Sequence, residues 1–327
     1  MEKMRKFYCL KLDFPFQAIS NKIDDFRAKR ITAYLDLMDT IVKEKFEELK
    51  DSFNKKNSEL AKYIEMLPDA SVIKEKFNHF LKNSSLGEVG KWIHENLSEG
   101  SIDVNIMTKL DKENYRDGVK LSQENNDAHA ALRGFAQSKL NSSIVLSAGM
   151  NPRLYSYIEE FDDFYPDETG FLQKKIILKV SDYRSALIQG KFLAKKGLWV
   201  SEYRVESGLN CGGHAFATQG HLLGPILEEF KNTRDSLVET THQLYVQALK
   251  DKKRFYPEMP LNVRITAQGG VGTADEHKFL MDYYELDSIG WGTPFLLVPE
   301  VTNVDPYTVN LLKDAKEDDL YLSNISP

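Results

Sequence analysis

The chain has 327 residues and a formal net charge of −6, with 42% hydrophobic and 28% charged residues. This is the composition of an ordinary globular protein with enough chain to bury a sizeable core. The negative charge argues against nucleic-acid binding, which needs clustered Lys and Arg to neutralise phosphates. The two cysteines, Cys9 and Cys211, exclude a disulfide framework and a four-thiolate metal site within one chain.

The opening residues and the apolar runs indicate where the protein works. The start, MEKMRKFYCLKLDF, lacks the apolar stretch of a signal peptide, and the apolar run at 295–298 is far too short to cross a bilayer. The low cysteine content fits a reducing compartment. We therefore expect a cytoplasmic protein that acts on a small molecule and has no membrane or nucleic-acid partner.

Residues 1–98 are expected to form a helical region. No Gly or Pro occurs between Pro15 and Pro68, and apolar residues recur there at helical spacing. The pattern predicts one long helix or a helical hairpin that breaks near 54–57, followed by a further helix over roughly 70–97. The mixed charge favours packing or homo-oligomerisation over binding to a membrane surface or a partner helix.

Residues 99–327 are expected to form an α/β domain, because short β-rich runs alternate with helical patterns. The predicted strands are 102–109, 143–148, 175–180, 198–203, 261–267 and 287–290. The predicted helices are 127–140, 152–161, 183–196, 224–249 and 273–284. This alternation indicates βαβ units and a parallel sheet, either doubly wound or closed into a barrel.

We expect a TIM-type (β/α) barrel, complete or incomplete in this chain. Six strands are two fewer than such a barrel needs. The two missing strands either lie near Phe7–Phe14, or are not recognised from the sequence pattern, or are absent from this chain.

Two glycine-rich turns predict a phosphate site. A strand leads into the first turn and a helix starts after it, so backbone N–H groups would point at an anion. A second strand ends in another such turn, as in the phosphate clamp after the last two strands of many barrels. The residues expected at this clamp are Gln268, Gly269, Gly270, Gly272, Thr273, Gly290, Gly292 and Thr293. The alternative is two ordinary tight turns.

The loop after the strand at 198–203 predicts a reactive site. Gly212 and Gly213 leave room for a flat ligand, and His214 follows them as a candidate general acid or base. Cys211 is either a nucleophile with a lowered pKa or an inert thiol. We expect no metal here, because Cys211, His214 and His221 lack the paired spacing of metal ligands.

Lys179 lies at the end of its predicted strand. Its charge would either neutralise a phosphate or a reduced flavin, or simply be solvated at the rim of the barrel.

These motifs carry a resemblance to a known family. The segment from Ser207 to His214, together with the two glycine-rich turns, resembles the FMN-dependent barrels of the nitronate monooxygenase family, which includes flavin enoyl reductases. Its Cys-Gly-Gly-His run is similar to the Ala-Gly-Gly-His-like loop of that family, with Cys211 in place of Ala. The stretch from Leu237 to Phe295 is also similar to the FMN domain of glutamate synthase, whose cluster-binding cysteines are missing here.

The resemblance implies an FMN-dependent oxidoreductase in which the glycine-rich turns hold the FMN phosphate. His214 would then exchange a proton with the substrate beside the flavin, which carries the redox chemistry. Two alternatives stay open. One is a barrel without flavin that acts on a phosphorylated substrate through Cys211 or His214, and the other is a non-catalytic barrel module of a larger protein.

Overall fold

The computed structural model describes residues 1–54, 58–67, 71–108, 111–147, 149–206, 223–269, 271, 273–291 and 305–319. The chain folds into two units. The first comprises Met1–Ile102 with Gln137–Leu140, and the second comprises Asp103–Ala136 with Asn141–Pro327.

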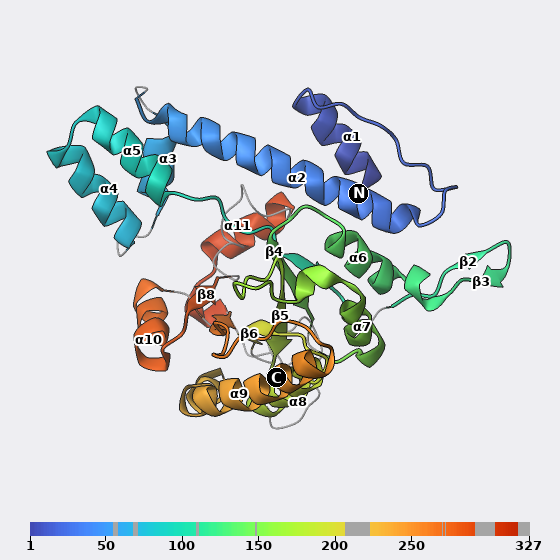
Figure 1. The fold of residues 1–327 in the computed structure, drawn as a ribbon. Helices are drawn as coiled ribbons and strands as arrows, with labels where there is room; N and C mark the ends of the chain where they lie inside the picture. Colours follow the sequence, from blue (N-terminus) through green and yellow to red (C-terminus); the bar gives the residue numbers. More distant parts are fainter. Residues whose placement is uncertain are drawn as a thin grey trace. The chain divides into compact units, whose positions relative to one another are not determined.

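The first unit is helical (Figure 1, blue to teal). Its elements are α1 (Glu2–Lys11), α2 (Phe26–Asp51), the short 3₁₀ helix η1 (Ser52–Asn54), α3 (Glu59–Met66), α4 (Val72–Asn83) and α5 (Leu86–Asn96). The last three helices contribute a small core of their own that includes Leu60, Phe77 and Ile93. Burial of these side chains supplies the main stabilisation of such short helices.

The helical pattern before Pro68 is divided, because α2 ends at Asp51 and α3 begins at Glu59. The helical region differs from the sequence expectation at two places. A single helix over 70–97 is wrong. Ser85 starts a new helix there, and its hydroxyl accepts from the Glu88 N–H while the Glu88 carboxylate accepts from the Ser85 N–H. The prediction of a strand near Phe7–Phe14 is also wrong, because α1 occupies most of that segment.

The second unit is built on a six-stranded parallel sheet. Its strands are β1 (Val104–Ile106), β4 (Ser142–Leu146), β5 (Lys174–Val180), β6 (Val200–Glu206), β7 (Arg264–Gln268) and β8 (Ser288–Gly290). All six predicted strands are present, with shifted ends. Their order in the sheet is the order in the chain, β1-β4-β5-β6-β7-β8. The fold class is therefore α/β, and the order of the described strands does not reverse as it does in a doubly wound sheet.

A small antiparallel hairpin lies between β1 and the next helix (Figure 1). It pairs β2 (Tyr115–Arg116) with β3 (Val119–Lys120). Asp117 and Gly118 form the turn, with φ angles of 50° and 78°. An Asp-Gly pair suits such a turn because it tolerates positive φ at both positions.

The helices of the second unit are α6 (Asp127–Ala136), α7 (Pro152–Tyr157), α8 (Tyr183–Ala194), α9 (Leu223–Asp251), α10 (Ala274–Tyr284) and α11 (Pro306–Asp314). Among them, α6 contacts β1, α8 contacts β5 and β6, and α10 contacts β8. The remaining short 3₁₀ helices are η2 (Gln123–Asn125), η3 (Ile158–Glu160), η4 (Asp162–Phe164) and η6 (Glu317–Asp319).

Close packing joins the sheet to α8 and α9, which lie side by side in Figure 1. A Cβ atom added at Gly190 of α8 would lie 2.2 Å from Tyr203 Oη and 3.3 Å from Thr241 Cγ2 of α9. Tyr203 is buried, and burial raises the pKa of its phenol. Because neighbouring residues of a strand point to opposite faces, Glu202 and Arg204 point away from these helices.

Candidate functional site

The face of the sheet that points away from α8 and α9 carries polar side chains near the carboxyl ends of β6 and β7. The strand register pairs Arg204 with Thr266 and Glu206 with Gln268. Glu202 lies on the same face, two residues earlier in β6. Parallel sheets bind their ligands at the carboxyl ends of the strands, so this face is the first place to look for a site.

Glu202 is the centre of a buried polar cluster. Its Oε1 accepts from the Thr266 hydroxyl at 2.7 Å and from Arg204 Nε at 2.9 Å. Arg204 Nη2 also lies 2.9 Å from Oε1, and Arg264 Nη1 lies 3.6 Å from Oε2. The carboxylate is thus shared by two guanidinium groups and one hydroxyl, which compensates for its burial.

A second ion pair stands beside this cluster. Lys179 Nζ lies 2.9 Å from Glu206 Oε1, and Glu206 is only 1% exposed. Lys179 and Arg204 are register partners on β5 and β6. The predicted rim lysine is therefore held next to Arg204, with its charge paired inside the protein.

A cavity of about 280 Å³ opens onto this polar face. It is lined by Arg204, Thr266, Ala267, Gln268, Ser288, Ile289 and Gly290. The lining comes from three adjacent strands, β6, β7 and β8, at their carboxyl ends. A polar cavity with a cationic wall is suited to a small ligand that carries negative charge.

The structure brings the two glycine-rich turns together at the edge of this cavity. The Gly269 N–H donates to the Gly290 carbonyl at 3.0 Å. Trp291 Nε1 donates to Nδ1 of His277, in the first turns of α10, at 2.8 Å. Gly269 has a φ of 85°, a conformation that favours glycine. The described parts of the two predicted turns are thus neighbours in space.

Thr273 caps α10, as its position before the helix predicts. Its hydroxyl accepts from the Glu276 N–H at 3.2 Å, and its own N–H donates to Glu276 Oε2 at 3.0 Å. A carboxylate therefore already stands at the start of this helix. A phosphate bound to the Thr273 N–H would have to displace it, because two anions at one helix start repel each other.

Several predicted site residues lie outside the described residues. They are Cys211, Gly212, Gly213, His214, Gly270, Gly272, Gly292 and Thr293. The sites predicted for them stay predictions. Of the remaining predicted residues, Gln268, Gly269 and Gly290 lie together at the cavity or its edge, Lys179 is linked to it through Glu206 and the register with Arg204, and Thr273 lies at the start of α10.

The sequence interpretation missed Glu202, Arg204 and Glu206. It ended the strand at residue 203 and assigned the following charges to a loop. The available signal was the alternation of charged residues at 202, 204 and 206 with apolar ones at 203 and 205, which is the period of a strand.

Another buried polar cluster lies between β1 and α6. His129 is 2% exposed, and its Nδ1 lies 2.7 Å from Asp111 Oδ2. Its Nε2 lies 3.2 Å from Gln123 Nε2, and Asp111 also accepts from the Ala128 N–H. Both ring nitrogens have protein partners, so this cluster orders the segment before α6 and presents no group to a ligand.

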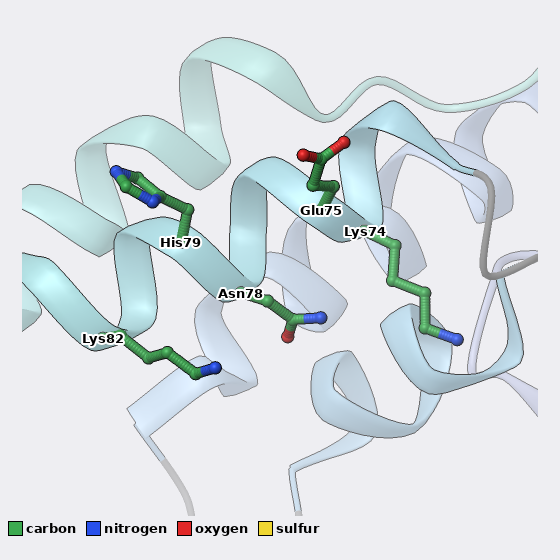
Figure 2. Close-up of a pocket in the computed structure, with 5 residues that line it drawn as sticks. All are labelled: Lys74, Glu75, Asn78, His79 and Lys82. Atoms are coloured by element: carbon green, nitrogen blue, oxygen red, sulfur yellow. The ribbon is translucent and has the colours of Figure 1, made fainter.

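A surface hollow of about 420 Å³ lies on α4, and its lining does not bring together side chains from several elements. Figure 2 shows that its lining side chains all belong to this one helix, with His79 and Glu75 pointing to one side and Asn78 and Lys82 to the other. Lys74 donates instead to the backbone carbonyls of Glu65 and Leu67. The hollow therefore assembles no site.

Among the described residues, no group of three or more His, Cys, Asp or Glu side chains is arranged to hold a metal ion. Within the same ranges, no helix has the length and apolar character needed to cross a membrane. No protein-family model matches the chain, and no curated protein matches it. The resemblance to the nitronate monooxygenase family therefore stays a prediction.

Proposed function

We propose that this chain is an FMN-dependent oxidoreductase of nitronate monooxygenase-like type, built on a TIM-type (β/α) barrel. The observation that carries the proposal is the meeting of the two glycine-rich turns beside a polar cavity, through the Gly269 to Gly290 hydrogen bond. The sequential order of the six parallel strands supports single winding, as in a barrel.

Three features of the described part of the clamp bear on phosphate binding. Gly269 has no side chain and a positive φ, so an anion can come close to its turn, while its own N–H donates to the Gly290 carbonyl. A Cβ at Gly290 would lie 3.4 Å from Gln268 Cγ, which is an ordinary van der Waals contact, so the space around Gly290 does not by itself demand glycine. The Glu276 carboxylate has to release the Thr273 N–H if that group is to join the clamp.

In this proposal the phosphate is held by Gln268, Gly269, Gly270, Gly272, Thr273, Gly290, Gly292 and Thr293. FMN would supply the hydride or electron transfer. His214 would act as the general acid or base for a small-molecule substrate, with Cys211, Gly212 and Gly213 beside it. Lys179, held by Glu206, would add positive charge near the flavin. The proposed setting is cytoplasmic, with homo-oligomerisation through the N-terminal helices.

The first test is an absorbance spectrum of the purified protein from about 300 to 550 nm, where a bound flavin absorbs. The same sample is measured again after FMN is added and the excess removed. We expect retained flavin bands. His214→Ala is expected to keep the flavin and to lose turnover, because it removes the proton-transfer group and leaves the clamp intact. A folded, colourless protein that retains no added FMN would contradict the proposal.

A second candidate function is favoured by the size of the cavity. At about 280 Å³ it is slightly smaller than the usual small-molecule site. A small phosphorylated substrate fits this volume better than a whole flavin, and Cys211 or His214 would then act on it. A colourless protein that binds such a substrate would support this candidate.

A further inference from the structure

The polar face of β5, β6 and β7 carries an excess of positive charge next to the cavity. Among the described residues, Lys179, Arg204 and Arg264 form ion pairs with two carboxylates, those of Glu202 and Glu206. One positive charge is therefore left over in a partly buried setting, where charges interact more strongly than in water. An anion in the cavity would balance it.

Arg204 is the cation best placed to meet that anion. It lines the cavity, and its side chain is 27% exposed. Its Nε and Nη2 atoms both face Glu202 Oε1. Among the described residues, no hydrogen bond is made by its Nη1. A guanidinium held along one edge presents its other N–H groups in a fixed direction, as oxyanion recognition requires.

Glu202 holds this orientation. It is fixed by the Thr266 hydroxyl from the neighbouring strand and approached by Arg264 on its other oxygen. Arg264 is a cation of the same charge beside the same carboxylate, but it does not line the cavity and its side chain is 45% exposed. The two arginines therefore differ in position and not in charge.

We infer that Arg204 binds an oxyanion group of the ligand, a carboxylate or a phosphate, in the cavity between β6, β7 and β8, and that Glu202 is its positioning residue. The inference rests on the proposed function only in taking this cavity as the ligand site. It adds a specificity-determining residue on β6, away from the glycine-rich turns. The ligand class is a small organic anion.

The test compares Arg204→Gln and Arg204→Lys with the control Arg264→Gln, which removes the same charge outside the cavity. Inorganic phosphate and succinate are titrated into each protein by isothermal calorimetry, and circular dichroism verifies folding. We expect Arg204→Gln to weaken binding by about 10- to 100-fold, since a hydrogen bond to a charged group is lost. Arg204→Lys keeps the charge beside Glu202 and is expected to show a smaller loss. Arg264→Gln removes charge beside Glu202 and a hydrogen bond to Ser288, but no group that lines the cavity itself, so it should weaken binding by a clearly smaller factor than Arg204→Gln.

The two probes distinguish a phosphate group of the ligand from a carboxylate group. A loss confined to phosphate assigns Arg204 to a phosphate group, and a loss confined to succinate assigns it to a carboxylate. Equal losses in Arg204→Gln and Arg264→Gln would overturn the inference, as would a folded Arg204→Gln that binds both probes normally or a wild type that binds neither. Flavin content is read from the absorbance of the same samples, so a failure of the flavin proposal is seen separately.

Discussion

At the residue scale, Glu202 is a buried carboxylate whose charge is compensated by its neighbours. A buried carboxylate costs several kcal/mol in desolvation unless it is paired and hydrogen-bonded. Thr266, Arg204 and Arg264 together offset that cost. Buried ion pairs of this kind contribute little net stability compared with apolar packing. Their presence beside a cavity therefore points to binding.

Glu159 gives a prediction for the pH dependence of stability. Burial raises the pKa of Glu159, but hydrogen bonds from Lys196 and Lys252 lower it more, so its pKa lies below the ordinary value. The two Nζ atoms lie 2.5 and 2.8 Å from the carboxylate. A lowered folded pKa contributes stability above the unfolded pKa and loses it as the pH falls through the folded pKa. We expect Glu159→Gln to lower the free energy of unfolding by about 1 kcal/mol at pH 7, and by less below about pH 4.

Urea unfolding of both proteins between pH 3 and 7, roughly the range over which a glutamate titrates, measures this difference. The exposed neighbour Glu160 supplies the control, and Glu160→Gln should follow the wild type across the range. A gap between wild type and Glu159→Gln that grows as the pH falls would show that the sign is wrong.

At the scale of elements, the sequence predicts which segments form strands better than where they end. All six strands of the main sheet follow from their β-rich runs, because burial against helices selects apolar residues on one face. The end of β6 was missed because its other face is charged, which is the reverse of the usual pattern for a strand in a parallel sheet. The charges on this face hid the strand from the sequence interpretation. The same charges form the polar face beside the cavity, to which Glu202, Arg204 and Glu206 belong.

Two further misses had local signals in the sequence. Ser85 followed by Glu88 is a capping box, which separates α4 from α5. Asp117-Gly118 is a hairpin turn, which joins β2 to β3. Long-range features such as the Gly269 to Gly290 hydrogen bond have no such signal, because they depend on how distant strands pair.

The contact between α8 and the sheet gives a prediction at the element scale. Gly190→Ala would place a methyl group 2.2 Å from the oxygen of the buried Tyr203. Overpacking of this kind costs about 1–3 kcal/mol. We expect Gly190→Ala to lower the free energy of unfolding by that amount, as measured by urea denaturation.

Tyr203→Phe provides the rescue for this variant. It removes the clashing oxygen, and the nearest remaining ring atom would lie 3.3 Å from the new methyl group. The double variant should therefore recover at least half of the loss. If the effects of the two substitutions on the free energy of unfolding are instead additive, the clash with Tyr203 is not the cause of the destabilisation.

At the scale of the whole molecule, the chain contains two units that each bury a core. Leu60 lies in the helical core and Leu178 in the sheet, and both are fully buried. Replacing a buried Leu by Ala costs about 2–5 kcal/mol. We expect Leu60→Ala to speed amide hydrogen exchange in α3, α4 and α5 while β5 and β6 stay protected, because the loss is confined to one core.

Leu178→Ala is the matched variant for the other core and should give the opposite exchange pattern. Hydrogen exchange read out by mass spectrometry resolves these segments. If both units lose protection together in either variant, they unfold as one cooperative body and the independence argued above is wrong.

The sequential order of the strands has a consequence for synthesis on the ribosome. Each strand of the main sheet pairs with the sheet strand that precedes it in the chain, so its template has already left the exit tunnel when it emerges. The sheet can then grow from β1 towards β8 by one βα unit at a time, with only modest loops to close at each step. Of the described strands, β7 and β8 arrive last, and they carry the two joined turns. Within this part of the sheet, the ligand cavity is therefore completed last.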